Sequence, residues 1–236
     1  MKKILHKAGN RGHADHGWLN AWHSFSFASY HDPEKVHFGV LRVLNDDTIA
    51  GGMGFGSHPH DNMEIITIPL SGQLEHKDSM GNTGVISKGE VQVMSAGTGI
   101  QHSEKNKNQD EALKLLQIWL FPNKKNVKPR YDQRAFDLEA AKNNLLTIVS
   151  SMGEKQGLNI YQNAWFRLGK LDKDYTLTYQ LKDKNNGVYV FVIDGDLLIN
   201  GEQLNRRDAL GIAGAGDLEI KANSESELLL MEIPMQ

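Results

Sequence analysis

The chain has 236 residues, with 26 Lys and Arg against 29 Asp and Glu, so its formal net charge is −3. This balance gives no basic footprint for DNA or RNA, and the absence of cysteine excludes disulfide scaffolds, thiolate metal sites and cysteine nucleophiles. No apolar run reaches the roughly 18 residues that span a bilayer, and the first residues, MKKILHK, lack the apolar region of a signal peptide. We therefore expect a cytoplasmic globular protein that binds neither membranes nor, directly, nucleic acids.

Short apolar or alternating runs, separated by Gly, Asn and Asp, recur along the chain and predict β-strands. They lie at residues 40–44, 64–70, 91–94, 115–121, 145–149, 175–181, 188–193, 197–199 and 228–233. One short helix is expected at 137–144, with Asp137 as its N-cap. The fold class is therefore all-β, a sandwich or barrel with little helix. A polar stretch with two prolines at 122–134 predicts the boundary between domains at 1–125 and 135–236.

Residues 65–97 and 188–216 share one pattern. Each begins with an apolar strand and a turn that ends in glycine, and continues through an acidic residue and a second short strand to Ala-Gly. The pattern predicts two copies of one β-barrel, although two unrelated β-meanders can share such a texture. This alignment places Ile220 and Ala222 of the second copy near His102 and Glu104 of the first. All ten histidines lie at or before position 102, so the second copy is expected to hold no metal.

Two pairs of side chains in the first copy have the spacing of metal ligands. His58 and His60 flank Pro59, and His102 and Glu104 are separated by one serine. Residues i and i+2 of a strand point to the same face, so each pair can reach one ion. Because proline lacks an N–H, Pro59 predicts a strand edge, a strand start or a bulge. Surface or hydrogen-bonded histidines are the alternative interpretation of a single such pair.

Three histidines and one carboxylate would provide only nitrogen and oxygen ligands. Such a set suits Fe, Mn, Co, Ni, Cu or Zn, and the ligand types alone do not choose among them. Glu64 shares a strand face with the first histidine pair and is the alternative carboxylate to Glu104. We interpret the remaining histidines as structural: His6, His13, His16, His23, His31, His37 and His76. Three aspartates are expected in turns or in solvent: Asp46, Asp47 and Asp61.

Three long motifs carry a family resemblance: RGHADHGWLNAWHSFSFASYHDP, FGSHPHDNMEIITIPLSGQLEHKDSMGN and GEVQVMSAGTGIQHSE. With them the chain resembles the pirin family of bicupins, and is most similar to the bacterial pirin-like proteins with quercetinase activity. The resemblance implies two cupin barrels packed face to face, with one metal in the N-terminal barrel. It implies His58, His60, His102 and Glu104 as the ligands, and leaves Glu64 a supporting or structural place.

The resemblance also implies a function, a metal-dependent dioxygenase that cleaves quercetin-like flavonols with O2 and releases carbon monoxide. The implied cofactor is one divalent transition metal, iron before Mn, Co, Ni, Cu or Zn. Glu104 is then the candidate to accept the proton of the flavonol 3-hydroxyl. A flat aromatic substrate needs an apolar slot, for which Met53, Phe55 and Met94 lie near the ligands in sequence. A monomer is expected.

The alternative function uses the same metal site. A metal-binding regulatory protein would sense iron redox state and act through a protein partner, as eukaryotic pirins do. The native substrate, if the protein is an enzyme, stays open.

Overall fold

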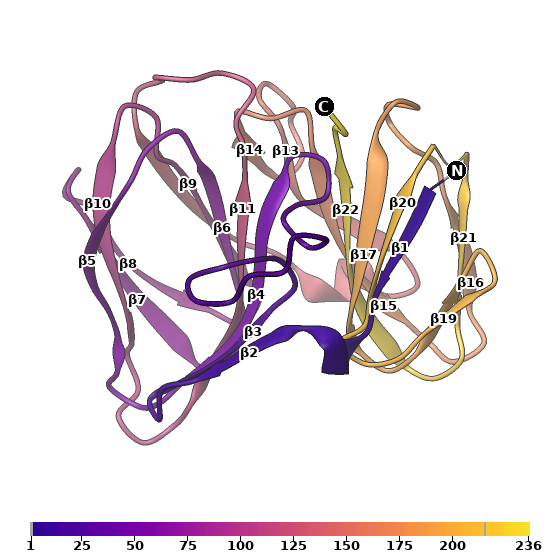
Figure 1. The fold of residues 1–236 in the computed structure, drawn as a ribbon, viewed down its shortest axis with the longest axis horizontal. Coiled ribbons are helices and arrows are strands. Elements are labelled where there is room, and N and C mark those ends of the chain that lie inside the picture. Colours follow the sequence, from indigo (N-terminus) through magenta and orange to yellow (C-terminus); the bar gives the residue numbers. More distant parts are fainter. Residues whose placement is uncertain (1, 215) are drawn as a thin grey trace.

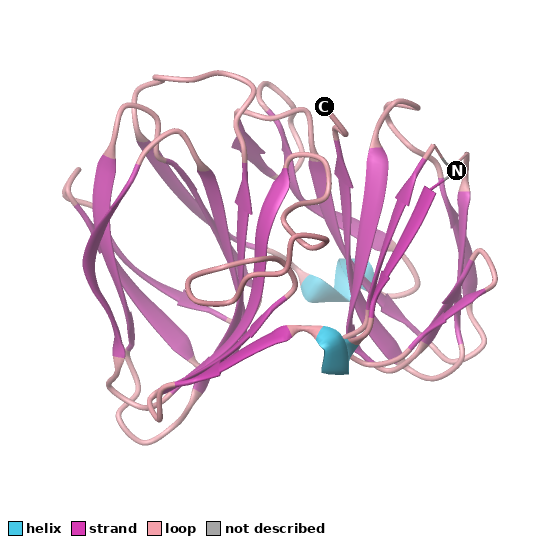
Figure 2. Cartoon of the chain, viewed as in Figure 1, coloured by secondary structure: helices cyan, strands magenta, loops and turns pink. Residues whose placement is uncertain are grey.

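A computed structural model describes residues 2–214 and 216–236 of the chain. β-Strands dominate the described residues, and the only helices among them are two short 3-10 helices, η1 (Ala8–Asn10) and η2 (Leu138–Ala141) (Figure 2). The strands build two barrels that lie side by side (Figure 1). The all-β prediction is therefore confirmed. No helix of the described residues is long and apolar enough to cross a membrane.

The first barrel consists of a seven-stranded and a four-stranded sheet. The larger sheet contains, in chain order, β2 (Gly12–Asp15), β3 (Leu19–His23), β4 (Leu41–Ile49), β6 (Glu64–Ser71), β9 (Glu90–Ser95), β11 (Leu113–Leu120) and β12 (Arg130–Ala135). The smaller sheet contains β5 (Gly54–His60), β7 (Gln73–Asp78), β8 (Thr83–Ser87) and β10 (Ile100–Asn106).

The second barrel repeats this division. Its larger sheet contains β1 (Lys2–His6), β13 (Leu145–Ser151), β14 (Leu158–Ile160), β15 (Trp165–Leu171), β17 (Gly187–Asp194), β20 (Ala209–Ala213) and β22 (Ser226–Ile233). Its smaller sheet contains β16 (Thr176–Tyr179), β18 (Leu197–Ile199), β19 (Glu202–Leu204) and β21 (Leu218–Ala222).

The strand orders show that the second barrel repeats the first except at one edge, where β14 runs parallel to β13 and β2 runs antiparallel to β3. The larger sheets run β12-β9-β6-β11-β4-β3-β2 and β1-β20-β17-β22-β15-β13-β14, and the smaller ones β5-β10-β7-β8 and β16-β21-β18-β19. β1 thus takes in the second barrel the place that β12 takes in the first. The predicted domain limits, 1–125 and 135–236, stay a prediction, and strand pairing crosses them twice, at β1 and at β12.

The pairing register corrects the alignment of the two copies. Glu104 of β10 lies opposite His76, and Ile220 of β21 lies opposite Ile199. Because His76 and Ile199 both stand four residues after the glycine of the preceding turn, Gly72 or Gly195, Ile220 corresponds to Glu104. His102 then corresponds to Leu218, two residues earlier than the sequence comparison suggested. The second copy replaces the polar pair with two buried aliphatic side chains.

Every run predicted as a strand contains a strand, but the predicted helix at 137–144 is wrong in type and length. Only η2 forms there, and Asp137 does cap it, since its carboxylate accepts from the N–H of Glu139 at 3.1 Å. Asn143 adopts a left-handed conformation with φ 50°, which ends any helix before a second turn can form.

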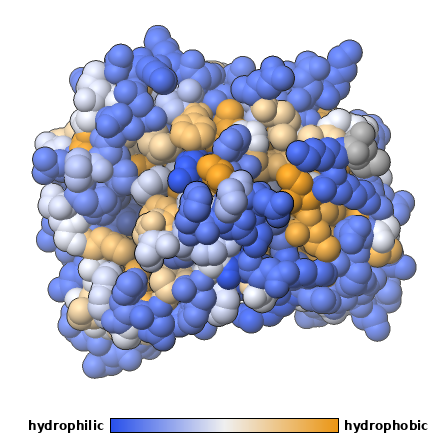
Figure 3. Space-filling model, viewed as in Figure 1, coloured by the Kyte–Doolittle hydropathy of each residue, from blue (hydrophilic) through white to orange (hydrophobic). Residues whose placement is uncertain are grey.

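The two barrels are joined through an apolar core between their larger sheets. Leu44 and Ile66 of the first barrel belong to the same buried cluster as Phe166 and Tyr189 of the second. Burying each such side chain contributes roughly 1.5–3 kcal/mol, so the barrels are not independent bodies. The face of the molecule in Figure 3 is largely hydrophilic, with apolar side chains gathered near its middle.

One glycine permits the close approach of β5 to β10. A Cβ added at Gly54 would lie 2.2 Å from the carbonyl oxygen of Glu104, whereas nothing lies within 4 Å of a Cβ added at Gly56. Gly54→Ala should therefore destabilise the fold by about 1–3 kcal/mol, and Gly56→Ala should stay within about 0.5 kcal/mol of wild type. Urea unfolding of both variants measures this difference, and equal midpoints would contradict it.

Candidate metal centre

The three predicted histidine ligands meet where β5 pairs with β10, on the wall of the first barrel that faces away from the second (Figure 1). His102 lies directly opposite His58, and His60 lies opposite Ile100. The ring centroids are 4.4 Å apart for His58 and His102, and 4.9 Å for each of the other two pairs. One ring nitrogen of each imidazole lies within 4.8 Å of those of the other two. β5 is an edge strand, as Pro59 predicted.

The hydrogen bonds of these imidazoles leave nitrogen atoms free for a metal. Both ring nitrogens of His102 are buried and have no hydrogen-bond partner in the protein. Nδ1 of His58 donates to the carbonyl oxygen of Gly56 at 2.8 Å, which leaves Nε2 as the lone-pair nitrogen. Unsatisfied buried polar atoms are costly, and a metal ion bound here would satisfy those that face it. The donor set therefore fits a divalent transition metal.

Burial keeps two of the imidazoles in the form that binds metals. Burial, reinforced by the neighbouring histidines, lowers the pKa of His102 to about 2. Burial and the nearby His58 lower the pKa of His60 to about 4. Both rings are consequently neutral at pH values near 7 and present a lone pair rather than a proton.

Glu104 follows His102 by two residues in β10, and residues at this spacing share a strand face. A β-bulge separates the two residues, so that the pairing of β10 with β5 shifts between them. The Glu104 carboxylate is buried, accepts from Nε2 of Gln117 at 2.9 Å and has a long contact of 3.5 Å with the Thr67 hydroxyl. Burial raises its pKa to about 7. A carboxylate oxygen lies within 4.8 Å of nitrogens of His102 and His76, whereas the close group of three histidines does not include it.

His76 is also near this group, but its ring is already satisfied. Its Nδ1 lies 3.0 Å from Nε2 of Gln92 and its Nε2 lies 3.4 Å from the Asp78 carboxylate. The ring stacks on Tyr131 with centroids 4.8 Å apart. These contacts give His76 a structural place, in contrast to the unpartnered nitrogens of His102.

Glu64 lies apart from both candidate ligand groups. Its Oε2 accepts from the Ser95 hydroxyl at 2.7 Å and from the backbone N–H of Tyr161 at 3.2 Å. Ser95 belongs to the first barrel and Tyr161 follows β14 of the second, so Glu64 links the two barrels. Burial raises the pKa of this carboxyl to about 7.

A largely apolar cavity of about 450 Å³ opens onto the centre, and His58 and Glu104 both line it. Of the residues expected to form an apolar slot, Phe55 lines this cavity. Met53 is exposed instead, and Met94 is buried in a separate cluster beside Trp119. Sequence reasoning missed most of the cavity, namely Trp18, Leu19, Ala21, His23, Phe27, Asn45, Asp47, Gln117 and Trp119.

The expectation for two aspartates was wrong. Asp46 and Asp47 lie within β4, because this strand runs on to Ile49 well beyond the apolar run that revealed it. Asp47 is only 5% exposed, its Oδ1 has no hydrogen-bond partner, and burial raises its pKa to about 8. Asp46 forms ion pairs with Arg11 at 3.3 Å and with Arg207 at 3.6 Å. Asp61 is exposed outside any strand, as expected.

Two barrels of this topology, with three histidines clustered on one of them, define a bicupin with a candidate metal site. Residues 5–120 match the family model Pirin, and residues 147–233 match a model described as the quercetinase C-terminal cupin domain. A curated relative, quercetin 2,3-dioxygenase of Escherichia coli K12, is 44% identical over 230 residues, 98% of each chain. The protein belongs to the pirin family.

Solved structures agree with this assignment. The crystal structure of YhhW from E. coli has a TM-score of 0.94 and 43% identity, covering 99% of this chain and 98% of that chain. A structure of the bacterial pirin YhhW in complex with nickel(II) has a TM-score of 0.93 and 42% identity, covering 99% of each chain.

The ligand assignment predicts which histidine variants lose metal. His58→Ala and His102→Ala should each retain less than about a tenth of the nickel that wild type holds after loading and desalting, because each loses a ligand atom. His76→Ala should retain it, since both of its nitrogens serve other partners. Elemental analysis of the three variants is the measurement. Wild-type nickel content in His102→Ala would refute the assignment.

Glu64 predicts a pH dependence of stability. Its pKa is raised from 4.5 to about 7 in the folded protein, so folding favours the protonated form. The contribution is fully present below the unfolded pKa and is lost as the pH rises through the folded pKa. Relative to Glu64→Gln, the free energy of unfolding of wild type should fall by on the order of 2 kcal/mol between about pH 5 and about pH 8. Urea unfolding measures it. Glu139→Gln, an exposed control, should follow wild type, and parallel curves for Glu64→Gln would contradict the assignment.

Proposed function

We propose that this protein is a dioxygenase that cleaves quercetin-like flavonols with O2 and releases carbon monoxide, using one divalent transition metal. His58, His60, His102 and Glu104 are the proposed ligands, and iron is the proposed metal, because mixed nitrogen and carboxylate sites suit iron in oxygenases. The observation that carries the proposal is the largely apolar cavity that opens onto His58 and Glu104. The similarity to relatives named quercetin 2,3-dioxygenase supports it.

Aromatic side chains on two sides of the cavity suit a flat substrate. Trp18 contacts Phe55 edge to face at 5.3 Å, and Phe27 contacts Trp119 edge to face at 5.4 Å. Oδ1 of Asp47 and Nε1 of Trp119 are buried without a hydrogen-bond partner. Ring hydroxyls and carbonyls of a flavonol would satisfy these atoms, and a site with such unpaired groups discriminates against analogues that lack them.

Glu104 is the proposed acceptor of the proton from the flavonol 3-hydroxyl. The Glu104 carboxylate is buried beside His102, where it can accept the proton that the substrate hydroxyl loses. When bound, the metal supplies Lewis acidity that lowers the pKa of the substrate hydroxyl. Gln117 and Thr67 hold the Glu104 carboxylate, whose two oxygens allow it to serve as ligand and as base.

The proposal predicts that the metal-loaded protein consumes quercetin. Protein loaded separately with Fe, Mn, Co, Ni, Cu or Zn should, with at least one metal, bleach the visible absorbance of quercetin, take up oxygen and release carbon monoxide in equal amounts. Full metal occupancy without turnover for every metal would refute the dioxygenase and leave the redox-sensing regulatory protein as the explanation of the site.

Three variants separate the roles within the cavity. Glu104→Gln should lower kcat by about 10²–10⁴-fold because it removes the proton acceptor, whereas Glu64→Gln should leave kcat within about twofold of wild type. Asp47→Asn should raise KM for quercetin by about tenfold without changing metal content. Elemental analysis of each preparation accompanies the kinetics, so that loss of metal is distinguished from loss of the base. Equal kcat for Glu104→Gln and Glu64→Gln would contradict the assignment.

A further inference from the structure

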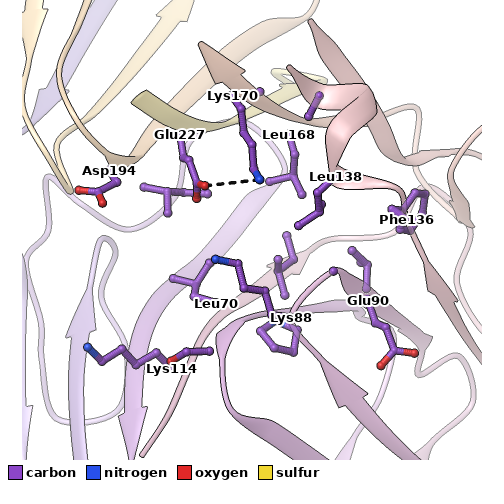
Figure 4. Close-up of a pocket in the computed structure, with 18 of the residues that line it drawn as sticks. Leu70, Lys88, Glu90, Lys114, Phe136, Leu138, Leu168, Lys170, Asp194 and Glu227 are labelled. Carbon is purple, nitrogen blue, oxygen red and sulfur yellow. Dashed lines mark ion pairs between the residues drawn. The ribbon is translucent and has the colours of Figure 1, made fainter. Parts of the chain in front are cut away.

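The groove between the two barrels contains two cavities that share a wall. One, of about 240 Å³, lies between the end of β6, the turn before β9 and η2, and is closed by residues of the second barrel (Figure 4). The other, of about 370 Å³, lies between η1 and β4. Lys114, Arg206 and Arg207 line both cavities. None of the four proposed metal ligands lines either, so this region is separate from the metal centre.

The smaller cavity has a mixed lining, with apolar side chains gathered along part of it. Figure 4 shows Leu70 from the first barrel facing Leu138 and Leu168 from the second, with Phe136 beside them. Ile193 also lines it. These apolar side chains can take up the apolar part of a ligand, while the charged residues of the same cavity lie nearer its polar part.

Positive charge gathers at the wall that the cavities share. Four cations line the larger cavity, Arg11, Lys114, Arg206 and Arg207, and a single carboxylate, Asp46, opposes them. Five cations and three carboxylates line the smaller cavity. Lys170 pairs with Glu227 at 3.9 Å and Arg206 with Asp194 at 3.0 Å, whereas Lys88, Lys114 and Glu90 have no ion pair among the described residues. The groove is therefore electropositive in a protein whose net charge is −3.

Arg207 stands out within this wall. Its side chain is 13% exposed, its Nη1 is buried without a hydrogen-bond partner, and its backbone is left-handed with φ 67°. Asp46 neutralises it only in part, because the same Oδ2 atom lies 3.3 Å from Arg11 and 3.6 Å from Arg207. A residue other than glycine in this conformation costs on the order of 1–3 kcal/mol, and such strain concentrates at ligand sites.

We propose that the groove between the barrels is a second ligand site, for a small amphipathic anion. Its head, a carboxylate or a phosphate monoester, would lie against Arg207, Arg206 and Lys114, and its apolar body would enter the cavity lined by Leu70, Leu138 and Leu168. The planar guanidinium fork suits either head group. If Arg207 had only a structural role, that role would explain its ion pair with Asp46. It would not explain why further cations line the same wall beside a cavity with apolar side chains.

Four probes test the head and the body of the ligand separately, on the full-length, nickel-loaded protein. Decanoate and decyl phosphate carry both parts, decanol carries only the body, and inorganic phosphate only the head. By calorimetry, at least one of the two amphipathic anions should bind at least about tenfold more tightly than decanol and than phosphate. The preferred anion identifies the head group. Decanol binding as tightly as both anions, or no binding of either, overturns the proposal.

Variants place the binding in the groove. Lys114→Gln and Arg207→Gln should each weaken binding of the preferred anion by about tenfold and leave that of decanol unchanged, while Leu138→Ser should weaken both. Lys114 is exposed, so its variant stays informative if Arg207→Gln fails to fold. Lys173→Gln, an exposed lysine outside both cavities, is the matched control.

One further comparison separates this site from the metal centre. His58→Ala should bind the anion as wild type does, because His58 lines neither groove cavity. Loss of anion binding in His58→Ala with wild-type binding in Lys114→Gln would place the anion at the metal centre and overturn the proposal. Since the readout is binding, the result does not depend on flavonol turnover.

Discussion

The first barrel encloses polar side chains that it does not satisfy by itself. His102 is 2% exposed and neither of its ring nitrogens has a partner, although imidazole nitrogens lose hydrogen bonds to water on burial. Two further imidazoles stand against it, with ring centroids 4.4 Å and 4.9 Å away. Bringing three imidazole rings and a buried carboxylate together in this way opposes folding, and a divalent cation that accepted their lone pairs would offset that cost. The pairing of β5 with β10 brings these rings together, and Gly54 lets the two strands approach.

The second barrel has a similar strand arrangement, but its interior has no histidine cluster among the described residues. Leu218 and Ile220 occupy the places of His102 and Glu104, and they pack with Val190, Leu210 and Leu230 into an apolar interior. An interior of this kind gains stability from every side chain it buries. The first barrel thus carries the buried His102 and Glu104, and the second, joined to it through a shared core, has aliphatic side chains at the same places.

Sequence alone reached the fold and the ligand spacing because both depend on the two-residue period of a strand. Apolar alternation located β6, β11, β17 and β22, and the same period put His58 beside His60. Apolar alternation did not give the full length of a strand where polar residues continue it, as in β4. Asp47 sits in β4 between Ala21 and Leu115 of the neighbouring strands, but its surroundings come from residues distant in sequence. The bulge after His102 is equally invisible, since an extra residue shifts pairing without leaving a composition signal.

The contribution of the second barrel extends beyond packing. Its turn between β19 and β20 brings Arg206 and Arg207 to the groove, against Arg11 and Asp46 of the first barrel. No stretch of the chain is basic enough to reveal this wall, because its cations come from segments nearly two hundred residues apart. Only the docking of the barrels assembles them. The second barrel, which has aliphatic side chains at the places of His102 and Glu104, thus contributes residues to the surface between the barrels, where one barrel alone offers half of a site. In this arrangement the metal centre belongs to one barrel, whereas the anion site belongs to the pair.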